Sequence, residues 1–86
     1  MQKITMFYME TCPYCKEAFR WMEELYGENA AYKSIEIEKI EETVHPEIAD
    51  KYDYYYVPTY YVGDEKRHEG AASIEKIRAV FDAAVG

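Results

Sequence analysis

The sequence has 86 residues, which is enough for one small domain and too short for a second hydrophobic core. Its formal net charge of −7 has the wrong sign for the phosphate contacts that dominate nucleic-acid affinity, so we expect no nucleic-acid partner. No apolar run approaches the roughly 20 residues of a membrane span, and the N-terminus lacks the apolar core of a signal peptide. We therefore expect a cytoplasmic protein with no membrane partner, acting as a monomer.

The sequence contains two cysteines, Cys12 and Cys15, three positions apart. A disulfide between them closes too short a loop to stabilise a fold by chain entropy. The pair follows an apolar run, Ile4 to Met9, that predicts a buried strand, and it opens an amphipathic segment that ends near Tyr26. This spacing beside a strand–helix–strand pattern is typical of a redox-active pair.

The segment after the cysteines is predicted to be a helix, with Thr11 as its cap, Pro13 in its first turn and Gly27 at its end. Cys12 is then the candidate nucleophile, because the unpaired N–H groups of a helix start stabilise a thiolate. Cys15 lies one turn inside and is shielded. It shares the apolar face, which repeats at helical spacing in Cys15, Ala18, Phe19, Met22, Leu25 and Tyr26.

The middle of the chain predicts a second strand and a second helix. Ile35 and Ile37 alternate with polar residues, which is typical of a half-buried strand and predicts a right-handed crossover with a parallel strand pair. The chain is polar from residue 39 to 43 and enters a helix at Pro46, with His45 near its cap. The acidic stretch 36–42 is either a solvated surface or one that selects basic partners.

The last part of the chain predicts two strands and a helix. Tyr60 to Val62 forms a third strand, and the Gly63-Asp64 turn returns the chain in an antiparallel edge strand over about 66–69. Ser73 caps a last helix, whose apolar positions are Ile74, Ile77, Val80, Phe81 and Ala84. The expected order is β-α-β-α-β-β-α.

Three motifs resemble those of one family. Cys12-Pro13-Tyr14-Cys15 is the motif of dithiol glutaredoxins, Val57-Pro58-Thr59 stands where that family has its proline loop, and Gly70 follows the hairpin as in the family. The resemblance to these members of the thioredoxin superfamily extends from Ile4 to Phe81. It implies an α/β protein with the minimal, glutaredoxin-like thioredoxin fold, in which three helices flank a four-stranded mixed sheet as a single domain over residues 1–86.

The resemblance also implies an activity. A dithiol glutaredoxin-like enzyme reduces protein or low-molecular-weight disulfides by attack of Cys12 and resolution by Cys15. Lys16 adds a cation near the thiolate, whereas Glu10 opposes it. The matching substrate-groove positions are Tyr14, Val57 and Thr59.

Two interpretations of Pro58 remain open. In the resembled family the proline is cis and faces the cysteines, which leaves the preceding backbone free to pair with a bound peptide or glutathione. Alternatively, Pro58 only starts the following strand, since proline lacks the N–H that a central ladder uses.

The glutathione contacts of the family are only partly present. Met9 stands where glutaredoxins place a Lys or Arg for a glutathione carboxylate, and Glu69 adds repulsion to an anionic ligand. Gly70 and Ser73 are the remaining candidate glutathione contacts. We expect no bound cofactor, and either glutathione or a thioredoxin reductase as the electron donor.

Several alternatives stand beside this prediction. In one alternative, the cysteines are half of a zinc site with His45 and His68, although the spacing of the histidines is wrong for such a site. In another, the cysteines hold an iron–sulfur cluster between two subunits. We expect no metal. The alternative functions are a glutathione-dependent deglutathionylase and a non-catalytic binding module that uses its tyrosine-rich face.

The tyrosines between positions 52 and 61 are expected to divide into two groups. Tyr52, Tyr54 and Tyr60 are expected to pack on the sheet and helices. Tyr55 and Tyr56 immediately precede the proline loop, and either contact substrate or lie in solvent.

Overall fold

The computed structural model describes all 86 residues. The predicted order β-α-β-α-β-β-α is confirmed, with one 3₁₀ helix, η1, added after the first helix. The elements are β1 (Ile4–Tyr8), α1 (Pro13–Glu28), η1 (Ala30–Ser34), β2 (Ile37–Glu41), α2 (Pro46–Ala49), β3 (Thr59–Val62), β4 (Glu65–Glu69) and α3 (Ile74–Val85).

The sheet has the strand order β2-β1-β3-β4. β1 is parallel to β2 and antiparallel to β3, and β3 and β4 form the predicted hairpin through Gly63-Asp64. Gly63 has a φ of +59°, a region that glycine adopts without strain. The expected fold class, a four-stranded mixed sheet flanked by three helices, is confirmed.

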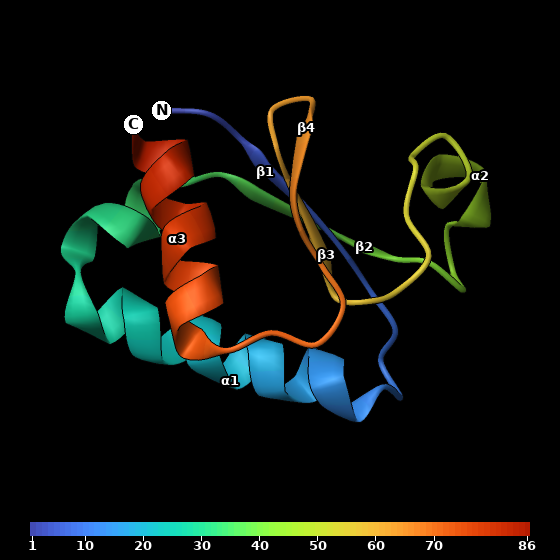
Figure 1. The fold of residues 1–86 in the computed structure, drawn as a ribbon, viewed down its shortest axis with the longest axis horizontal. Helices are drawn as coiled ribbons and strands as arrows, with labels where there is room; N and C mark the ends of the chain where they lie inside the picture. Colours follow the sequence, from blue (N-terminus) through green and yellow to red (C-terminus); the bar gives the residue numbers. More distant parts are fainter.

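The helices lie in two layers, with the sheet between them (Figure 1). Alternate residues of β1 point to the two faces, as strand geometry requires. Ile4 and Met6 belong to the larger core cluster, which is formed with α1 and α3. Phe7 belongs to a smaller cluster on the other face, together with Ala49 of α2. β1 is therefore buried on both faces.

The start and end of α1 differ from the prediction. The cap is Cys12 and not Thr11, because the Cys12 N–H donates to the Met9 carbonyl at 3.1 Å and this turn moves the helix start one residue later. The helix also continues through Gly27 to Glu28. It ends at Asn29, whose side chain accepts a hydrogen bond from the Ala31 N–H at 3.0 Å and starts η1.

β2 also begins later than predicted. Ile35 is not a strand residue but a buried residue at the end of η1. The strand begins at Ile37, because the parallel register pairs Ile4 with Ile37 and Tyr8 with Glu41. Residues 39–41 of the polar stretch thus form the second half of an edge strand.

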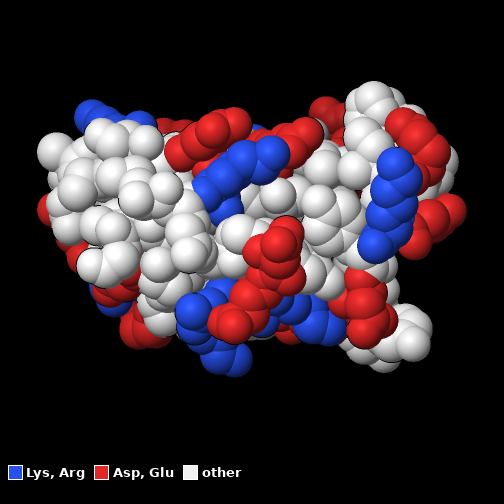
Figure 2. Space-filling model, turned by 90° about the horizontal axis from the view of Figure 1, so that it is seen from above, with Lys and Arg blue, Asp and Glu red and all other residues white.

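The remaining local predictions for helix starts are confirmed. His45 is the N-cap residue of α2, and Ser73 caps α3 by accepting a hydrogen bond from the Lys76 N–H at 3.2 Å. None of the helices has the length and apolarity that crossing a membrane requires. On the face seen from above, Lys and Arg side chains alternate with Asp and Glu and form no continuous basic surface (Figure 2).

Candidate active site

Three predicted site segments meet at one end of the sheet. β1 delivers its C-terminal end directly into the Met9–Cys12 turn. The antiparallel register pairs Phe7 with Thr59, so Pro58 lies beside the end of β1. The Gly70 N–H donates to the Pro58 carbonyl at 2.8 Å, which brings the chain after the hairpin to the same place. The fold thus brings together the cysteine loop, the proline loop and Gly70.

The cysteine loop is fixed by backbone hydrogen bonds. The carbonyl of Cys12 accepts from the N–H groups of Cys15 and Lys16, at 3.1 Å each, and Pro13 occupies the first turn. No side chain caps the helix. The positive end of the α1 dipole is therefore directed at Cys12.

The two thiols are free, and their surroundings differ sharply. Cys12 is half-buried, whereas Cys15 is only 1% exposed. Burial raises the pKa of the Cys15 thiol to about 12; a Met9 N–H opposes this effect, and the Cys12 sulfur adds to it. One sulfur is thus accessible to a substrate while the other is held protonated behind it.

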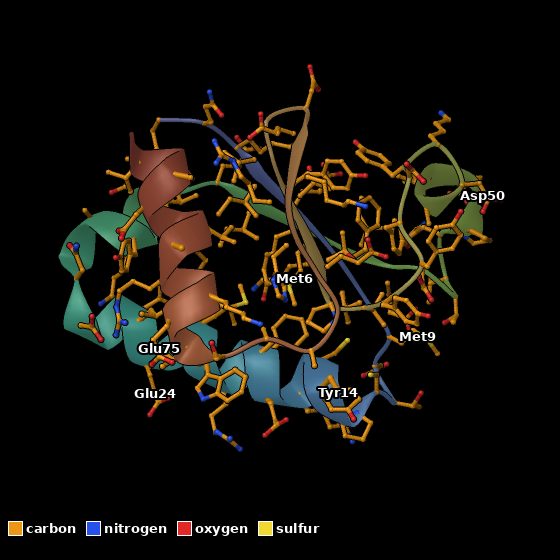
Figure 3. The ribbon with its side chains drawn as sticks, in the orientation of Figure 1. Met6, Met9, Tyr14, Glu24, Asp50 and Glu75 are labelled. Carbon is orange, nitrogen blue, oxygen red and sulfur yellow. The ribbon has the colours of Figure 1, made fainter.

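The side chains around the thiols are mostly exposed. Lys16 and Glu10 are exposed and form no ion pair with one another. Tyr14 is 56% exposed and lies on the first turn of α1, close to the loop that carries Met9 (Figure 3). Tyr14 therefore presents an aromatic surface beside Cys12.

The proline loop combines a buried turn with exposed rings. The Val57–Pro58 peptide bond is cis, and Pro58 and Thr59 are buried. The Thr59 hydroxyl donates to the Tyr56 carbonyl. Tyr55 and Tyr56, at 85% and 70% exposure, stand before this turn and leave their rings in solvent.

The other tyrosines pack as expected. The rings of Tyr52 and Tyr54 lie 4.7 and 4.8 Å from that of Phe7, between their centroids. Tyr60 is fully buried, with its hydroxyl 3.3 Å from the Met22 sulfur. Burial raises the pKa of Tyr60, and so would a charge on Cys15, so this phenol stays neutral.

Glu69 has a structural role that the sequence did not predict. One carboxylate oxygen pairs with Lys66 at 2.8 Å, and the other accepts from the N–H groups of Tyr55 and Tyr56. The bond to Lys66 is the largest cause that lowers the pKa of the Glu69 carboxyl, and the two backbone bonds add to it. Together they lower this pKa to about 2. Glu69 therefore ties β4 to the loop that leads into Pro58. Sequence reasoning missed this bond because the partners are backbone groups 13 and 14 positions away.

Two acids at the end of β2 also hold the cysteine loop. The Glu42 N–H donates to the Tyr8 carbonyl at 3.0 Å, and the Glu10 N–H donates to the Glu41 carboxylate at 3.1 Å. Glu42 in turn accepts from the Tyr54 hydroxyl at 2.7 Å. The sequence showed these residues only as part of an acidic stretch.

The remaining candidate residues have other partners. The Ser73 hydroxyl caps α3, and the His68 ring bonds the Gly70 carbonyl at 2.9 Å. No three His, Cys, Asp or Glu side chains lie close enough together to hold a metal ion. The two cysteines, His45 and His68 thus do not come together in this structure as the zinc alternative requires.

Comparisons with known proteins agree with this geometry. A family model described as a thioredoxin domain matches residues 2–82. A search of curated proteins gave no match.

Solved structures resemble the fold over most of the chain. The thioredoxin of Malassezia sympodialis is 17% identical with a TM-score of 0.75, covering 96% of this chain and 74% of its own. The oxidised thioredoxin of Plasmodium falciparum is 19% identical with a TM-score of 0.72, covering 96% and 80%. An uncharacterised thioredoxin-like protein from Clostridium perfringens is 26% identical with a TM-score of 0.68, covering 98% and 71%.

The difference between the thiols predicts selective alkylation. In the reduced protein at about pH 8, iodoacetamide should label Cys12 first. Cys15 should react on the order of a thousandfold more slowly than a free cysteine, because a pKa of about 12 leaves little thiolate. Mass spectrometry of Cys12→Ser and Cys15→Ser, folded and in urea, measures both rates. Equal labelling of the two folded variants would contradict the assignment.

The Glu69 clamp predicts a dependence of stability on pH. Its folded pKa of about 2 lies below the ordinary 4.5, so the ionised carboxylate stabilises the fold above about pH 4.5, and this contribution is lost as the pH falls towards 2. Glu69→Gln should lower the free energy of unfolding at neutral pH and lose less of it on acidification. Urea unfolding at several pH values tests this, with Glu65→Gln on the same strand as control. An unchanged acid slope in Glu69→Gln would refute the clamp.

Proposed function

The chain belongs to the thioredoxin domain family, and from this membership we propose that it is a thiol–disulfide oxidoreductase reducing protein or low-molecular-weight disulfides through Cys12 and Cys15. The observation that carries the proposal is the unequal burial of the two thiols at the start of α1. A nucleophile must be reachable, whereas a resolving thiol must stay protected until the substrate is attached. A protein that only binds partners has no use for this difference.

The proposed reaction has two exchange steps. The Cys12 thiolate attacks one sulfur of the substrate disulfide, the substrate S–S bond breaks, and the leaving sulfur departs as a thiolate that takes a proton. Cys15 then loses its proton and attacks the Cys12 sulfur. The second substrate thiol is released, and a Cys12–Cys15 disulfide holds the oxidised pair. The substrate gains two electrons and two protons.

An external reductant must restore the dithiol, and we propose a protein donor such as a thioredoxin reductase. The glutathione contacts implied by the glutaredoxin-like motif are weak in this chain. Met9 offers no cation, and the Gly70 N–H donates to the Pro58 carbonyl. The Ser73 oxygen accepts from the Lys76 N–H, so only its O–H remains for a ligand. Glutathione remains the second candidate donor.

The setting of this activity is proposed from its chemistry. A dithiol that must return to the reduced state fits a reducing compartment, and we propose the cytosol. The net charge of −7 favours neither nucleic acid nor an anionic surface as partner. The substrate segment is proposed to lie along Tyr14 and Val57, because Thr59, the third position expected to line this groove, is fully buried.

Replacement of each cysteine should give a different outcome. Cys12→Ser should abolish reduction of a protein disulfide. In Cys15→Ser, Cys12 should still attack the substrate, and the mixed disulfide between Cys12 and the substrate should accumulate. Insulin reduction followed by turbidity, with non-reducing mass spectrometry of the Cys15→Ser product, measures both. Trp21→Phe, on α1 away from the cysteine loop, serves as the control. Full activity of Cys12→Ser would refute the assigned roles.

The absent cation at Met9 predicts weak glutathione binding. Met9→Lys should tighten glutathione binding about two- to fivefold, the size of one exposed ion pair. Calorimetry measures the affinity, with Met9→Gln as a polar, uncharged control. An equal effect of both substitutions would mean that the glutathione carboxylate is held elsewhere. Comparing turnover with thioredoxin reductase against turnover with glutathione and its reductase then identifies the donor.

A further inference from the structure

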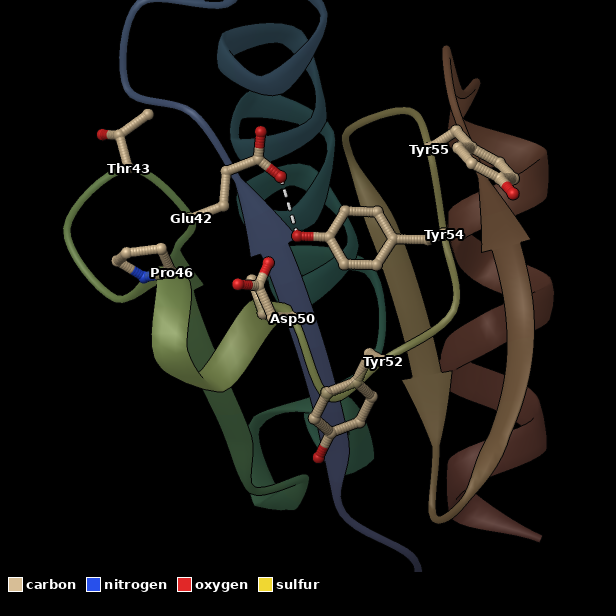
Figure 4. Close-up of a pocket in the computed structure, with 8 residues that line it drawn as sticks. Glu42, Thr43, Pro46, Asp50, Tyr52, Tyr54 and Tyr55 are labelled. Atoms are coloured by element: carbon tan, nitrogen blue, oxygen red, sulfur yellow. Dashed lines mark hydrogen bonds between the residues drawn. The ribbon is translucent and has the colours of Figure 1, made fainter.

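A cavity of about 350 Å³ lies between α2, the end of β2 and the loop before Pro58 (Figure 4). Its lining differs in character from that of the thiol site. Its lining includes three tyrosines and two carboxylates, and no Lys or Arg lines it. The lining residues are Glu42, Thr43, Pro46, Ala49, Asp50, Tyr52, Tyr54 and Tyr55.

The two carboxylates face the same space. Glu42 accepts the Tyr54 hydroxyl bond at 2.7 Å, which fixes one of its oxygens and leaves the other free. The Asp50 side chain is exposed, makes no ion pair, and points to the space between Glu42 and Tyr52 (Figure 4). Carboxylates and tyrosine faces both attract a cation. An anion would meet repulsion from both acids.

The residues that line the cavity are connected to the proposed active site through the backbone. Glu42 is bonded through its N–H to Tyr8, at the point where β1 enters the cysteine loop. Tyr54 and Tyr55 lead within three residues to Val57 and Pro58, and Glu69 fixes this loop in place. A polypeptide bound along the proline loop can therefore place one of its side chains in the cavity.

We propose that this cavity binds the ammonium or guanidinium group of a lysine or arginine located near the reacting cysteine of a disulfide-containing protein. The inference rests on the proposed function for the disulfide and adds the class of substrate. A lysine or arginine stem can pack on the rings of Tyr52 and Tyr54 while its head meets the two carboxylates. The net charge of −7 also attracts a basic partner from a distance.

Binding of the cation has a consequence for the second step of the reaction. Burial is the main cause that raises the pKa of the Cys15 thiol, and the charge of Glu42 adds to it. A cation beside Glu42 offsets that charge. A basic substrate then makes the resolving thiol easier to ionise at the stage when it must attack.

The test uses peptides that carry one cysteine as a mixed disulfide with 5-thio-2-nitrobenzoate. Each peptide of one set carries a single lysine, placed one or two positions before or after the cysteine. Each peptide of the matched set carries norleucine at the same position. The reduced protein in excess releases the coloured thiolate when Cys12 attacks. At the best position the lysine peptide should react about fivefold faster than its norleucine partner, the size expected of one partly desolvated cation contact.

Variants of the acids test which residues cause the preference for lysine peptides. Glu42→Gln, which can still accept the Tyr54 bond, and Asp50→Asn should each remove most of it. Glu47→Gln, an exposed acid of α2 that pairs with His45 and does not line the cavity, should keep it. Circular dichroism of each variant checks that the fold is retained.

The outcomes separate the two proposals. Release of the coloured thiolate from no peptide would refute the proposed function itself. The cation site would be overturned if lysine and norleucine peptides released the thiolate at equal rates. It would also be overturned if Glu47→Gln lost the preference for lysine as fully as Glu42→Gln and Asp50→Asn. Either result would leave the proposed oxidoreductase function standing. Inhibition by free arginine without any preference among the peptides would assign the cavity to a small cation and overturn the proposal as well.

Discussion

The pairing of β1 with β3 is the constraint on which the candidate site depends. β1 is buried on both faces and pairs with a strand on each edge, so its C-terminal end has a fixed position in the core. The register that pairs Phe7 with Thr59 sets the cysteine loop and Pro58 beside each other, although they lie more than forty positions apart in the chain. A one-residue shift of β3 would turn Tyr60 to the wrong face of the sheet, so core packing and site geometry are specified together.

The difference between the thiols follows from helix geometry and burial. Cys12 caps α1 and lies at its exposed start, whereas Cys15 lies one turn inside, against the core. The carbonyl of Cys12 accepts from the N–H groups of Cys15 and Lys16, which fixes the relative position of the two residues. Lys16 and Glu10 are exposed, so solvent screens the effect of each charge on the thiols. Their charges are also opposite in sign. Burial is therefore the main source of the asymmetry at this site.

The sequence predicts the order of the elements and the three segments of the site because these depend on local signals. Apolar runs, helical spacing, the Ser73 cap and the Gly63-Asp64 turn each act within a few residues. The boundaries that failed at α1 and at Ile35 depend on local turn and cap geometry. Glu41, in contrast, became a strand residue because it pairs with the distant Tyr8. The Glu69 clamp and the Glu42–Tyr54 bond could not be predicted for the same reason, since each joins residues at least 12 positions apart. The catalytic and binding roles of the individual residues stay predictions.

The loop before Pro58 is held by acids rather than by apolar packing alone. Glu69 binds its backbone from β4, and Glu42 binds the Tyr54 hydroxyl from the end of β2. The two acids differ in what remains available to a partner. Glu69 uses both oxygens and is neutralised by Lys66, whereas Glu42 keeps a free oxygen and has no cation beside it. Negative charge is thus compensated where the loop meets β4 and uncompensated where it meets β2. A substrate that follows this loop therefore meets an attraction for positive charge only on the side of the tyrosine-lined cavity.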